Sequence, residues 1–352
     1  NVMHVFPENP AKILVRSTNW IGDAVMTTPA LRSIREAYPD SEIVLLAYHW
    51  VSDVFRYSPR VDRIISYDKR GRHHGLFGLW QLAKELRQEQ FDCAILLQNA
   101  FEAALLAFLA KIPVRGGYAT DGRSLLLTHR VEKALNIVVK HEVFYYQRIL
   151  RGLGIPTGPN DLEIFLPGFE IDAAKARLHQ LTGARSPSSL LIGFNPGAAF
   201  GPAKRWPAAR YAELAVLLSK RYDAHILLFG SAADQPTTAE IIQLAGKKAR
   251  LIDLAGRTRL ITAMALIGEC DAFVTNDSGL MHIAAALHTP QVALFGSTDH
   301  IATGPYSASA VVIRKELPCS PCKEKKCPLK HFQCMKMISS EEVFAALVQM
   351  LY

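Results

Sequence analysis

The segment 275–282 has the residue types best suited to chemistry, and it directly follows an apolar run at 272–274. Three of its residues favour the start of a helix: Asn276, Asp277 and Ser278. A helix that begins where a strand ends presents unpaired backbone N–H groups and the positive end of its dipole, which suits a diphosphate. Gly279 permits close approach of that group, and His282 lies one turn further on the same rim. The alternative is a capped helix with a satisfied histidine.

A long loop at 195–207 follows another apolar run and is the second candidate. It contains two glycines and ends in Lys204 and Arg205 beside Trp206. The loop resembles a phosphate cradle, although it is not the Walker pattern, because no Gly-Lys-Ser/Thr occurs. A lysine here would neutralise charge that develops on a departing phosphate. A solvated loop with chance basic residues is the alternative.

Asp23 follows the first apolar run and falls in the opening turn of the predicted helix at 22–38. A carboxylate at a helix start is ordinarily stabilising, so a purely structural role is an open alternative. A carboxylate in the first loop of one half could also accept a proton from an attacking hydroxyl.

Asp234 ends a loop of small residues at 229–234 and could hold ribose hydroxyls, with a plain turn as the alternative. No Gly-x-Gly-x-x-Gly follows a strand, and neither His-Glu-x-x-His nor Gly-x-Ser-x-Gly occurs. The absence of these motifs argues against a dehydrogenase, a zinc hydrolase and a serine hydrolase.

The elements that must position these residues alternate between strand and helix along both halves of the chain. Strands are predicted at 12–15, 42–47, 64–67, 93–97, 190–194, 225–229, 250–254, 272–275 and 292–295. Helices are predicted at 22–38, 79–88, 172–180, 211–221, 237–245, 261–269, from 279, and at 340–351. This alternation predicts an α/β fold of two doubly wound Rossmann-like domains facing a cleft. Ligands bind beyond the carboxyl ends of such strands, where the candidate loops lie.

The domain boundary is predicted where glycines and prolines interrupt the pattern. We expect an N-terminal domain at 1–168, a linker at 169–188 and a second domain at 189–335. A C-terminal helix at 336–352 could pack back on the N-terminal domain.

Composition narrows the class of protein. The 352 residues include 40 Lys+Arg and 32 Asp+Glu, a net charge of +8, and 49% are hydrophobic, which excludes intrinsic disorder. No apolar run reaches the roughly 18 residues of a membrane span, and residues 1–10 lack the pattern of a secretory signal. The basic residues are dispersed without an RNA-binding motif, so we expect no nucleic-acid partner. An anionic substrate or membrane surface fits the charge, as does a merely basic surface.

Six cysteines are too few for a disulfide framework, which favours the cytoplasm. Four of them cluster near the C-terminus: Cys319, Cys322, Cys327 and Cys334. Four thiols at this spacing could bind a structural zinc or iron–sulfur centre or form two disulfides, although the spacing matches no common zinc ribbon.

Three segments, 19–31, 194–207 and 275–282, taken in order, resemble the ADP-heptose:lipopolysaccharide heptosyltransferases of glycosyltransferase family 9. The resemblance spans nearly the whole chain and implies a two-domain GT-B enzyme, with an acceptor-side Rossmann-like domain at 1–168 and a nucleotide-sugar-binding Rossmann-like domain at 189–335. Such an enzyme transfers L-glycero-D-manno-heptose from ADP-heptose to the heptosylated Kdo-lipid A inner core of lipopolysaccharide. It inverts the anomeric centre and requires no cofactor.

The resemblance also implies roles for individual residues. Asp23 corresponds to the catalytic base and Lys204 to the lysine that contacts phosphate. The donor-binding positions are Asp277, Ser278, Gly279, His282 and, on the ribose, Asp234. Arg123 corresponds to a basic position assigned to the anionic acceptor. The implied location is cytoplasmic, peripheral on the inner face of the inner membrane. Another nucleotide sugar or acceptor, or a non-catalytic nucleotide-sugar-binding protein, remains an alternative.

Overall fold

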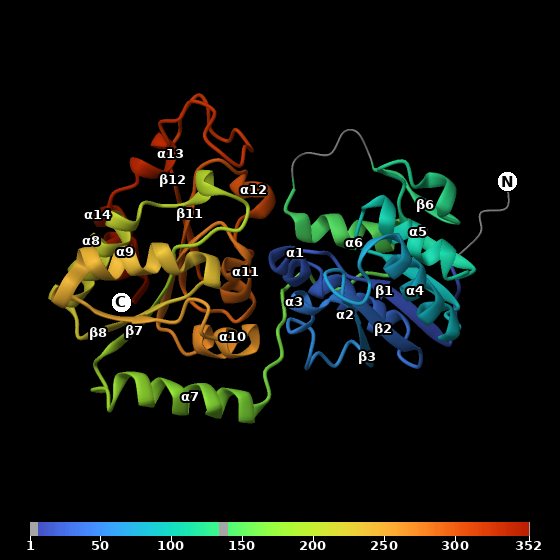
Figure 1. The fold of residues 1–352 in the computed structure, drawn as a ribbon, viewed down its shortest axis with the longest axis horizontal. Helices are drawn as coiled ribbons and strands as arrows, with labels where there is room; N and C mark the ends of the chain where they lie inside the picture. The colour runs from blue at the N-terminus through green and yellow to red at the C-terminus, as the bar shows by residue number, and fades with distance from the viewer. Residues whose placement is uncertain (1–5, 134–139, 352) are drawn as a thin grey trace. The chain divides into compact units, whose positions relative to one another are not determined.

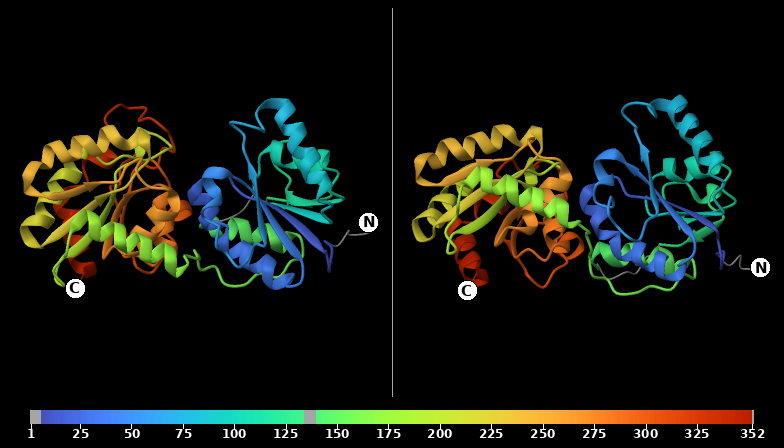
Figure 2. Two further views of the ribbon diagram at one scale, coloured as in Figure 1. Left: turned by 60° about the horizontal axis from the view of Figure 1, so that its bottom comes forward. Right: turned by 90° about the horizontal axis from the view of Figure 1, so that it is seen from below.

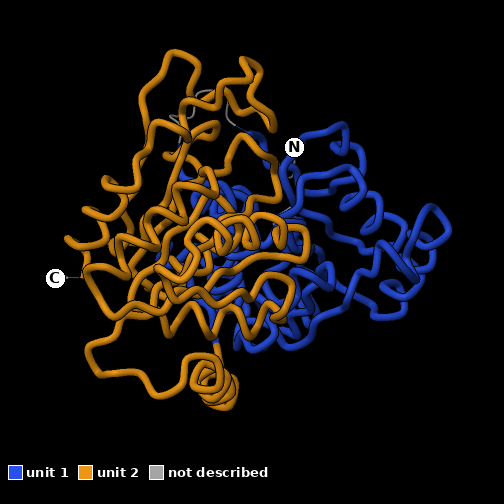
Figure 3. Tube along the Cα trace, turned by 60° about the vertical axis from the view of Figure 1, so that its left-hand side comes forward, with its two compact units in different colours: residues 1–165 blue, residues 166–352 orange. Residues whose placement is uncertain are grey.

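The computed structural model describes residues 6–133 and 140–351, and the chain divides into two compact units, Asn1–Phe165 and Leu166–Tyr352 (Figure 3). Each unit contains one six-stranded sheet, and all the strand pairs are parallel. Helices cover the sheets, as the views in Figure 2 show. The predicted pair of α/β domains is therefore confirmed.

The first unit has the strand order β3-β2-β1-β4-β5-β6. Figure 1 labels many of its helices and strands. Its elements are β1 (Lys12–Arg16), α1 (Ile21–Met26), α2 (Thr28–Ala37), β2 (Glu42–Tyr48), α3 (His49–Ser52), β3 (Arg63–Tyr67), α4 (Gly75–Gln88), β4 (Cys93–Leu96), α5 (Phe101–Leu109), β5 (Val114–Tyr118), η1 (Ser124–Leu126), β6 (His129–Val131) and α6 (Glu142–Gly152).

The second unit has the order β12-β11-β10-β7-β8-β9. Its elements are α7 (Gly168–Thr182), β7 (Leu190–Asn195), η2 (Pro202–Lys204), α8 (Ala208–Arg221), β8 (Ala224–Leu228), η3 (Ala232–Asp234), α9 (Gln235–Ala245), η4 (Gly246–Lys248), β9 (Arg250–Asp253), α10 (Leu260–Gly268), β10 (Ala272–Asn276), α11 (Gly279–Ala286), β11 (Gln291–Phe295), α12 (His300–Thr303), β12 (Ala310–Arg314), α13 (Gln333–Lys336) and α14 (Ser340–Leu351).

Both sheets have the same topology, with β7 in the place of β1. The strand order reverses between β1 and β4 in one sheet and between β7 and β10 in the other. At such a switch point the flanking loops leave in opposite directions and open a crevice at the carboxyl edge. The loops after β7 and β10 are the two segments, 195–207 and 275–282, for which the sequence predicts phosphate binding.

The central strands read as continuous apolar runs because both faces of each sheet are covered. Ile13 and Val15 of β1 and Phe273 and Val274 of β10 have no exposed surface. Because these strands are buried on both faces, they hold the first residues of the loops at their carboxyl ends in defined positions.

The helix predicted at 22–38 is in fact two helices, α1 and α2, separated at Thr27. Pro29, near the start of α2, has no N–H to bond to a carbonyl one turn back. The hydroxyl of Thr28 donates instead to the Val25 carbonyl at 2.7 Å. Asp23 consequently belongs to a short helix of its own.

The first two-thirds or so of the predicted linker forms α7, which includes the helix predicted at 172–180 and packs against α10 in the second unit. The Arg177 guanidinium bonds to the Arg257 carbonyl at 3.1 Å. The predicted terminal helix is present as α14. It packs against α8 of its own unit, with Val343 and Leu347 in that unit's core.

Candidate active site

The loops after β7 and β10 are joined at the switch point by an ion pair. Lys204 Nζ lies 2.6 Å from Asp277 Oδ2, and the two side chains are only 13% and 4% exposed. Nζ also lies 4.6 Å from the centroid of the Phe200 ring. Thr298, which follows β11, donates to the same Asp277 oxygen at 2.6 Å. A largely buried ammonium is thus held at the carboxyl edge, where the sequence predicts a phosphate.

Two buried asparagines fix the shape of this edge. Asn195, at the end of β7, donates from Nδ2 to the Ser278 hydroxyl at 2.5 Å. Asn276, at the end of β10, accepts at Oδ1 from the Trp206 backbone N–H at 3.2 Å and from the Tyr211 hydroxyl at 3.1 Å. These bonds cross between the two loops and therefore determine where Lys204 emerges.

The start of α11 is open to a ligand at its backbone. Ser278 is the N-cap residue, but its side chain makes no capping bond to the helix. The Met281 backbone N–H bonds to the Ser278 carbonyl at 3.2 Å, and the N–H groups of Gly279 and Leu280 precede the hydrogen-bonded turns of the helix. His282, by contrast, is only 3% exposed. The structure places this histidine in the interior, not on the open rim that the sequence suggested.

Asp234 lies beside the β7 loop and is 8% exposed. Its Oδ2 accepts from the Ser231 backbone N–H at 2.9 Å and from the Ser231 hydroxyl at 2.8 Å, which forms a capping box for η3. Oδ1 lies 3.7 Å from an Arg205 nitrogen. A Cβ atom at Gly197 would lie 2.5 Å from the Asp234 carboxylate, so the backbone passes the side chain closely. The loops after β7, β8, β10 and β11 therefore meet at one edge.

Asp23 lies in the first turn of α1, at the carboxyl edge of the first sheet, and is partly exposed. Sequence reasoning missed its neighbour Glu142, in the first turn of α6. Burial raises the pKa of the Glu142 carboxyl, and the negative charge of Asp23 raises it further. Burial likewise raises the pKa of Tyr146 well above its ordinary range, with Asp23 contributing. The charge of Asp23 therefore acts on a second carboxyl group, that of Glu142.

The loop that leads to Asp23 is held by the end of β1. The Arg16 guanidinium stacks 5.0 Å from the centroid of Tyr48 and 5.5 Å from that of Tyr67. It donates to Asn19 Oδ1 at 2.9 Å. The Trp50 indole donates to the Asn19 carbonyl at 3.1 Å. These contacts give the entry to α1 a defined path.

Arg123 does not occupy an open position. Its side chain is fully buried, and burial lowers its pKa to about 10. The guanidinium donates to the carbonyls of Tyr118 and Gln98 at 2.8 and 2.5 Å and to Asn99 Oδ1 at 3.2 Å. Its donors are therefore engaged with the loops after β4 and β5. The structure makes Arg123 a residue that orders these loops, which does not favour the predicted contact with acceptor.

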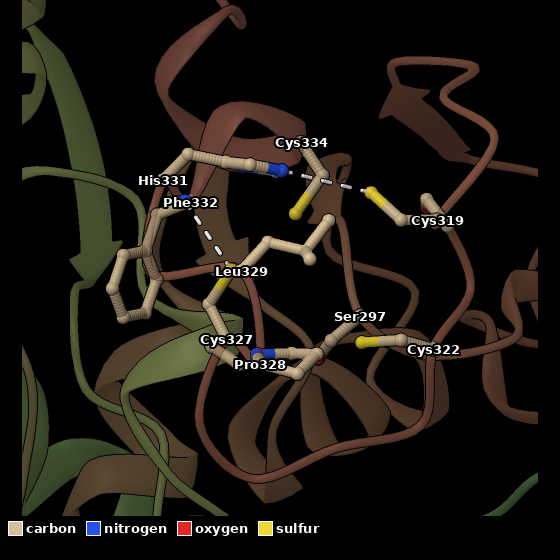
Figure 4. A pocket seen from close by; sticks show the side chains of 11 residues that line it. Ser297, Cys319, Cys322, Cys327, Pro328, Leu329, His331, Phe332 and Cys334 are labelled. Carbon is tan, nitrogen blue, oxygen red and sulfur yellow. Dashed lines mark hydrogen bonds between the residues drawn. The ribbon is translucent and has the colours of Figure 1, made fainter.

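The four cysteines of the C-terminal cluster surround one small pocket (Figure 4). All are free thiols, and Cys319 Sγ lies 4.0 Å from His331 Nε2. The Phe332 backbone N–H donates to Cys327 Sγ at 3.4 Å, and this bond is the largest influence lowering the pKa of that thiol. Within residues 6–133 and 140–351, no three His, Cys, Asp or Glu side chains are arranged to hold a metal ion. The suggested zinc or iron–sulfur centre is therefore unsupported, as is a disulfide.

A largely buried lysine, ion-paired at the switch point of a parallel sheet to the residue just before the N-cap of a helix, is an arrangement that suits a phosphate-bearing ligand. The sequence match gives the class directly: the chain belongs to glycosyltransferase family 9 (heptosyltransferase), whose profile matches residues 79–333.

Within the family, the chain is similar to enzymes named heptosyltransferase 2. It is 40% identical to lipooligosaccharide heptosyltransferase 2 of Haemophilus ducreyi, over 86% of this chain and 88% of that protein. It is 36% identical to lipopolysaccharide heptosyltransferase 2 of Escherichia coli K12 at the same coverage. The solved structure of E. coli ADP-heptose lps heptosyltransferase II superposes with a TM-score of 0.80 at 32% identity, covering 97% of this chain and 98% of that one. The resemblance to the GT-B heptosyltransferases is thereby confirmed.

Proposed function

We propose that this protein transfers L-glycero-D-manno-heptose from ADP-heptose to the heptosylated Kdo-lipid A inner core of lipopolysaccharide. The observation that carries the proposal is the Lys204–Asp277 pair beside the open start of α11. The names of the relatives support heptose as the sugar and lipopolysaccharide as the acceptor.

Lys204 and the backbone N–H groups from Gly279 onward bind the diphosphate in this proposal. In the structure, the Lys204 ammonium is balanced by Asp277. The oxygens of a bound diphosphate would share the Lys204 ammonium with the Asp277 carboxylate. The positive charge then stabilises the negative charge that develops on the diphosphate as its bond to the sugar breaks. Such preorganised groups stabilise charge most where water is excluded, and each is worth about 10²–10³ in rate.

Asp23 is the general base. Its carboxylate accepts the proton of the acceptor hydroxyl while that oxygen bonds to the anomeric carbon from the face opposite ADP. The bond between the anomeric carbon and the diphosphate oxygen breaks, and its electron pair leaves with ADP. One bond forms and one breaks on opposite faces, so the anomeric centre inverts. These residues perform the transfer in our proposal without a metal or cofactor.

Asp234 contacts the ribose and Asp277, Ser278 and His282 shape the donor pocket in this proposal. Asp277 acts through Lys204, and Ser278 through the loop bond from Asn195. His282, which is almost fully buried within α11, contributes to the wall of that pocket.

The lipid acceptor places the reaction at the inner face of the inner membrane in our proposal. The net charge of +8 suits an anionic surface. Among the described helices, none has the length and hydropathy to cross a bilayer.

The decisive experiment replaces Asp23 with Asn. ADP release from ADP-heptose in the presence of heptosylated acceptor should fall by about 10² or more, while ADP binding measured by calorimetry stays unchanged. Asp40→Asn, an exposed carboxylate of the same unit, is the matched control and should keep full turnover. Full turnover by the Asp23 variant would refute the base assignment. Faster release from ADP-glucose than from ADP-heptose would refute the sugar assignment.

A further inference from the structure

The first turns of α4 carry large apolar side chains that the first unit leaves in solvent. Leu76, Phe77 and Trp80 are 86%, 75% and 55% exposed. The Phe77 and Trp80 ring centroids lie 6.1 Å apart. Helix α5, which packs beside α4 (Figure 1), also carries exposed rings, Phe101 and Phe108, at 46% and 47%. Scattered exposed apolar residues are ordinary, but a contiguous patch marks an interaction surface.

The exposed residues of α4 share one side of the helix. At about 100° per residue, Leu76, Phe77 and Trp80 fall within one sector of about 100°. The opposite side packs into the unit through Leu79, Leu82 and Leu86, which are at most 7% exposed. The apolar side chains in solvent are therefore additional to the ordinary buried face of an amphipathic helix.

Basic residues continue the same side of α4 and border it. Lys84 and Arg87 fall in the same sector, one and two turns after Trp80, and both are exposed. Lys84 Nζ lies 5.8 Å from the centroid of the Trp80 ring. Arg70, in the loop before the helix, stacks 5.0 Å from the centroid of Trp50. Residues 69–88 contain five Lys/Arg and one Glu. This surface is complementary in charge to an anionic partner.

The first turns of α4, which carry Leu76, Phe77 and Trp80, begin at the same edge of the sheet as Asp23. Strands β1 and β3 belong to one parallel sheet, so their following loops leave from its carboxyl edge. Contacts join these loops: Arg16 at the end of β1 stacks on Tyr67 at the end of β3, and the Tyr67 hydroxyl donates to Glu102 of α5 at 2.9 Å. A partner bound at the start of α4 is thus near the edge that carries the proposed base.

We infer that the α4 face, formed by Leu76, Phe77, Trp80, Lys84 and Arg87, docks on the surface of an anionic lipid bilayer. Its apolar residues reach the boundary between headgroups and acyl chains, and its basic residues contact lipid phosphates. Aromatic rings beside basic side chains are the pattern of interfacial helices. The inference rests on the proposed function in one respect, because a lipid A acceptor is held in such a bilayer.

Sedimentation with vesicles tests the inference on the full chain. The wild-type protein should co-sediment with phosphatidylcholine vesicles that contain phosphatidylglycerol, and Trp80 fluorescence should shift to shorter wavelength. High salt should weaken the binding. The variants Phe77→Glu/Trp80→Glu and Lys84→Glu/Arg87→Glu should each lose at least about tenfold in partitioning.

Matched controls lie in the second unit. Leu244→Glu replaces an apolar residue of α9 that is 54% exposed, close to the 55% of Trp80. Lys247→Glu/Lys248→Glu makes the same change in net charge as Lys84→Glu/Arg87→Glu. Both controls should bind vesicles as the wild type does. Wild-type binding by the two α4 variants would overturn the inference. So would a dimer in analytical ultracentrifugation that the Phe77/Trp80 variant dissociates, because the patch would then be a contact between two copies.

Activity on an acceptor core freed of its acyl chains separates this inference from the proposed function. The α4 variants should turn over that water-soluble acceptor at the wild-type rate, which also shows that they fold. They should lose at least about fivefold on acceptor embedded in vesicles. If the wild-type protein transfers heptose to neither acceptor, the proposed function is refuted. The sedimentation experiment still tests binding to vesicles independently.

Discussion

Lys204 Nζ and Asp277 Oδ2 lie 2.6 Å apart although 73 positions separate them in the sequence. One follows β7 and the other follows β10, and these strands are neighbours in the sheet. The topology therefore creates a buried ion pair at the switch point. A buried pair loses most when one partner is removed, because the other charge is left unpaired.

Replacing Lys204 by Met should lower kcat/KM about 10²–10³-fold, because the leaving diphosphate loses its cation. It should also destabilise the fold by about 3–5 kcal/mol by leaving Asp277 unpaired. Steady-state kinetics and urea unfolding measure the two effects. Lys204→Met/Asp277→Asn should recover stability but not turnover, and Lys220→Met, at an exposed lysine of α8, should alter neither. A double variant with restored turnover would contradict the role of Lys204.

Asn276→Ala should lower the free energy of unfolding by about 1–3 kcal/mol, since the Trp206 N–H loses its buried acceptor and the Pro196 carbonyl loses the Asn276 amide donor, while the Tyr211 hydroxyl keeps the Asn195 carbonyl. The KM for ADP-heptose should rise because the β7 loop is no longer held against β10. Thermal unfolding measures the change in stability. Steady-state kinetics at a temperature below the unfolding transition measures the KM for ADP-heptose. An unchanged KM would show that the asparagine only stabilises the fold.

Glu142 should make stability depend on pH in a defined direction. Burial and the charge of Asp23 raise its pKa above the ordinary value of 4.5. A raised carboxyl pKa contributes stability that is present below pH 4.5 and is lost as pH rises through the raised value. Glu142→Gln should therefore gain stability over the wild type above this window and show no gain below it. Urea unfolding across pH measures the difference.

The coupling between the two carboxyl groups can be read in the Asp23→Asn variant. Removing the Asp23 charge should lower the pKa of Glu142, although burial keeps it above its ordinary value. NMR titration of the Glu142 side chain checks this. An unchanged pKa would mean that burial alone causes the shift.

Arg123→Met should lower stability by about 3 kcal/mol or more, because several buried acceptors lose a charged donor. The KM for acceptor should change little in the fraction that stays folded. Arg130→Met, at an exposed position of the same unit, should leave stability unchanged. A stable Arg123 variant with a large increase in acceptor KM would restore the acceptor-contact role that the resemblance implied.

The alternation of apolar runs and amphipathic segments is enough to predict the α/β class. Runs such as the one at β10 are apolar throughout because parallel strands are buried on both faces. The sequence also located the Lys204 and Asp277 loops, because each directly follows such a run. It did not indicate β5, β6 or β12, which are short, lie at or near a sheet edge and include Gly116 and Gly117 in β5. A strand at a sheet edge is only partly covered by helices, so its sequence need not be a continuous apolar run and is harder to recognise.

Local sequence could determine which loops follow strands, because strand and helix periodicity is a property of neighbouring residues. Only the tertiary structure decided which distant side chains meet. It placed Glu142 beside Asp23, directed the Arg123 guanidinium into the interior and left the α4 face in solvent. These outcomes depend on how a sheet and its helices pack, and the burial and charge of a group are set by neighbours that the linear sequence does not specify.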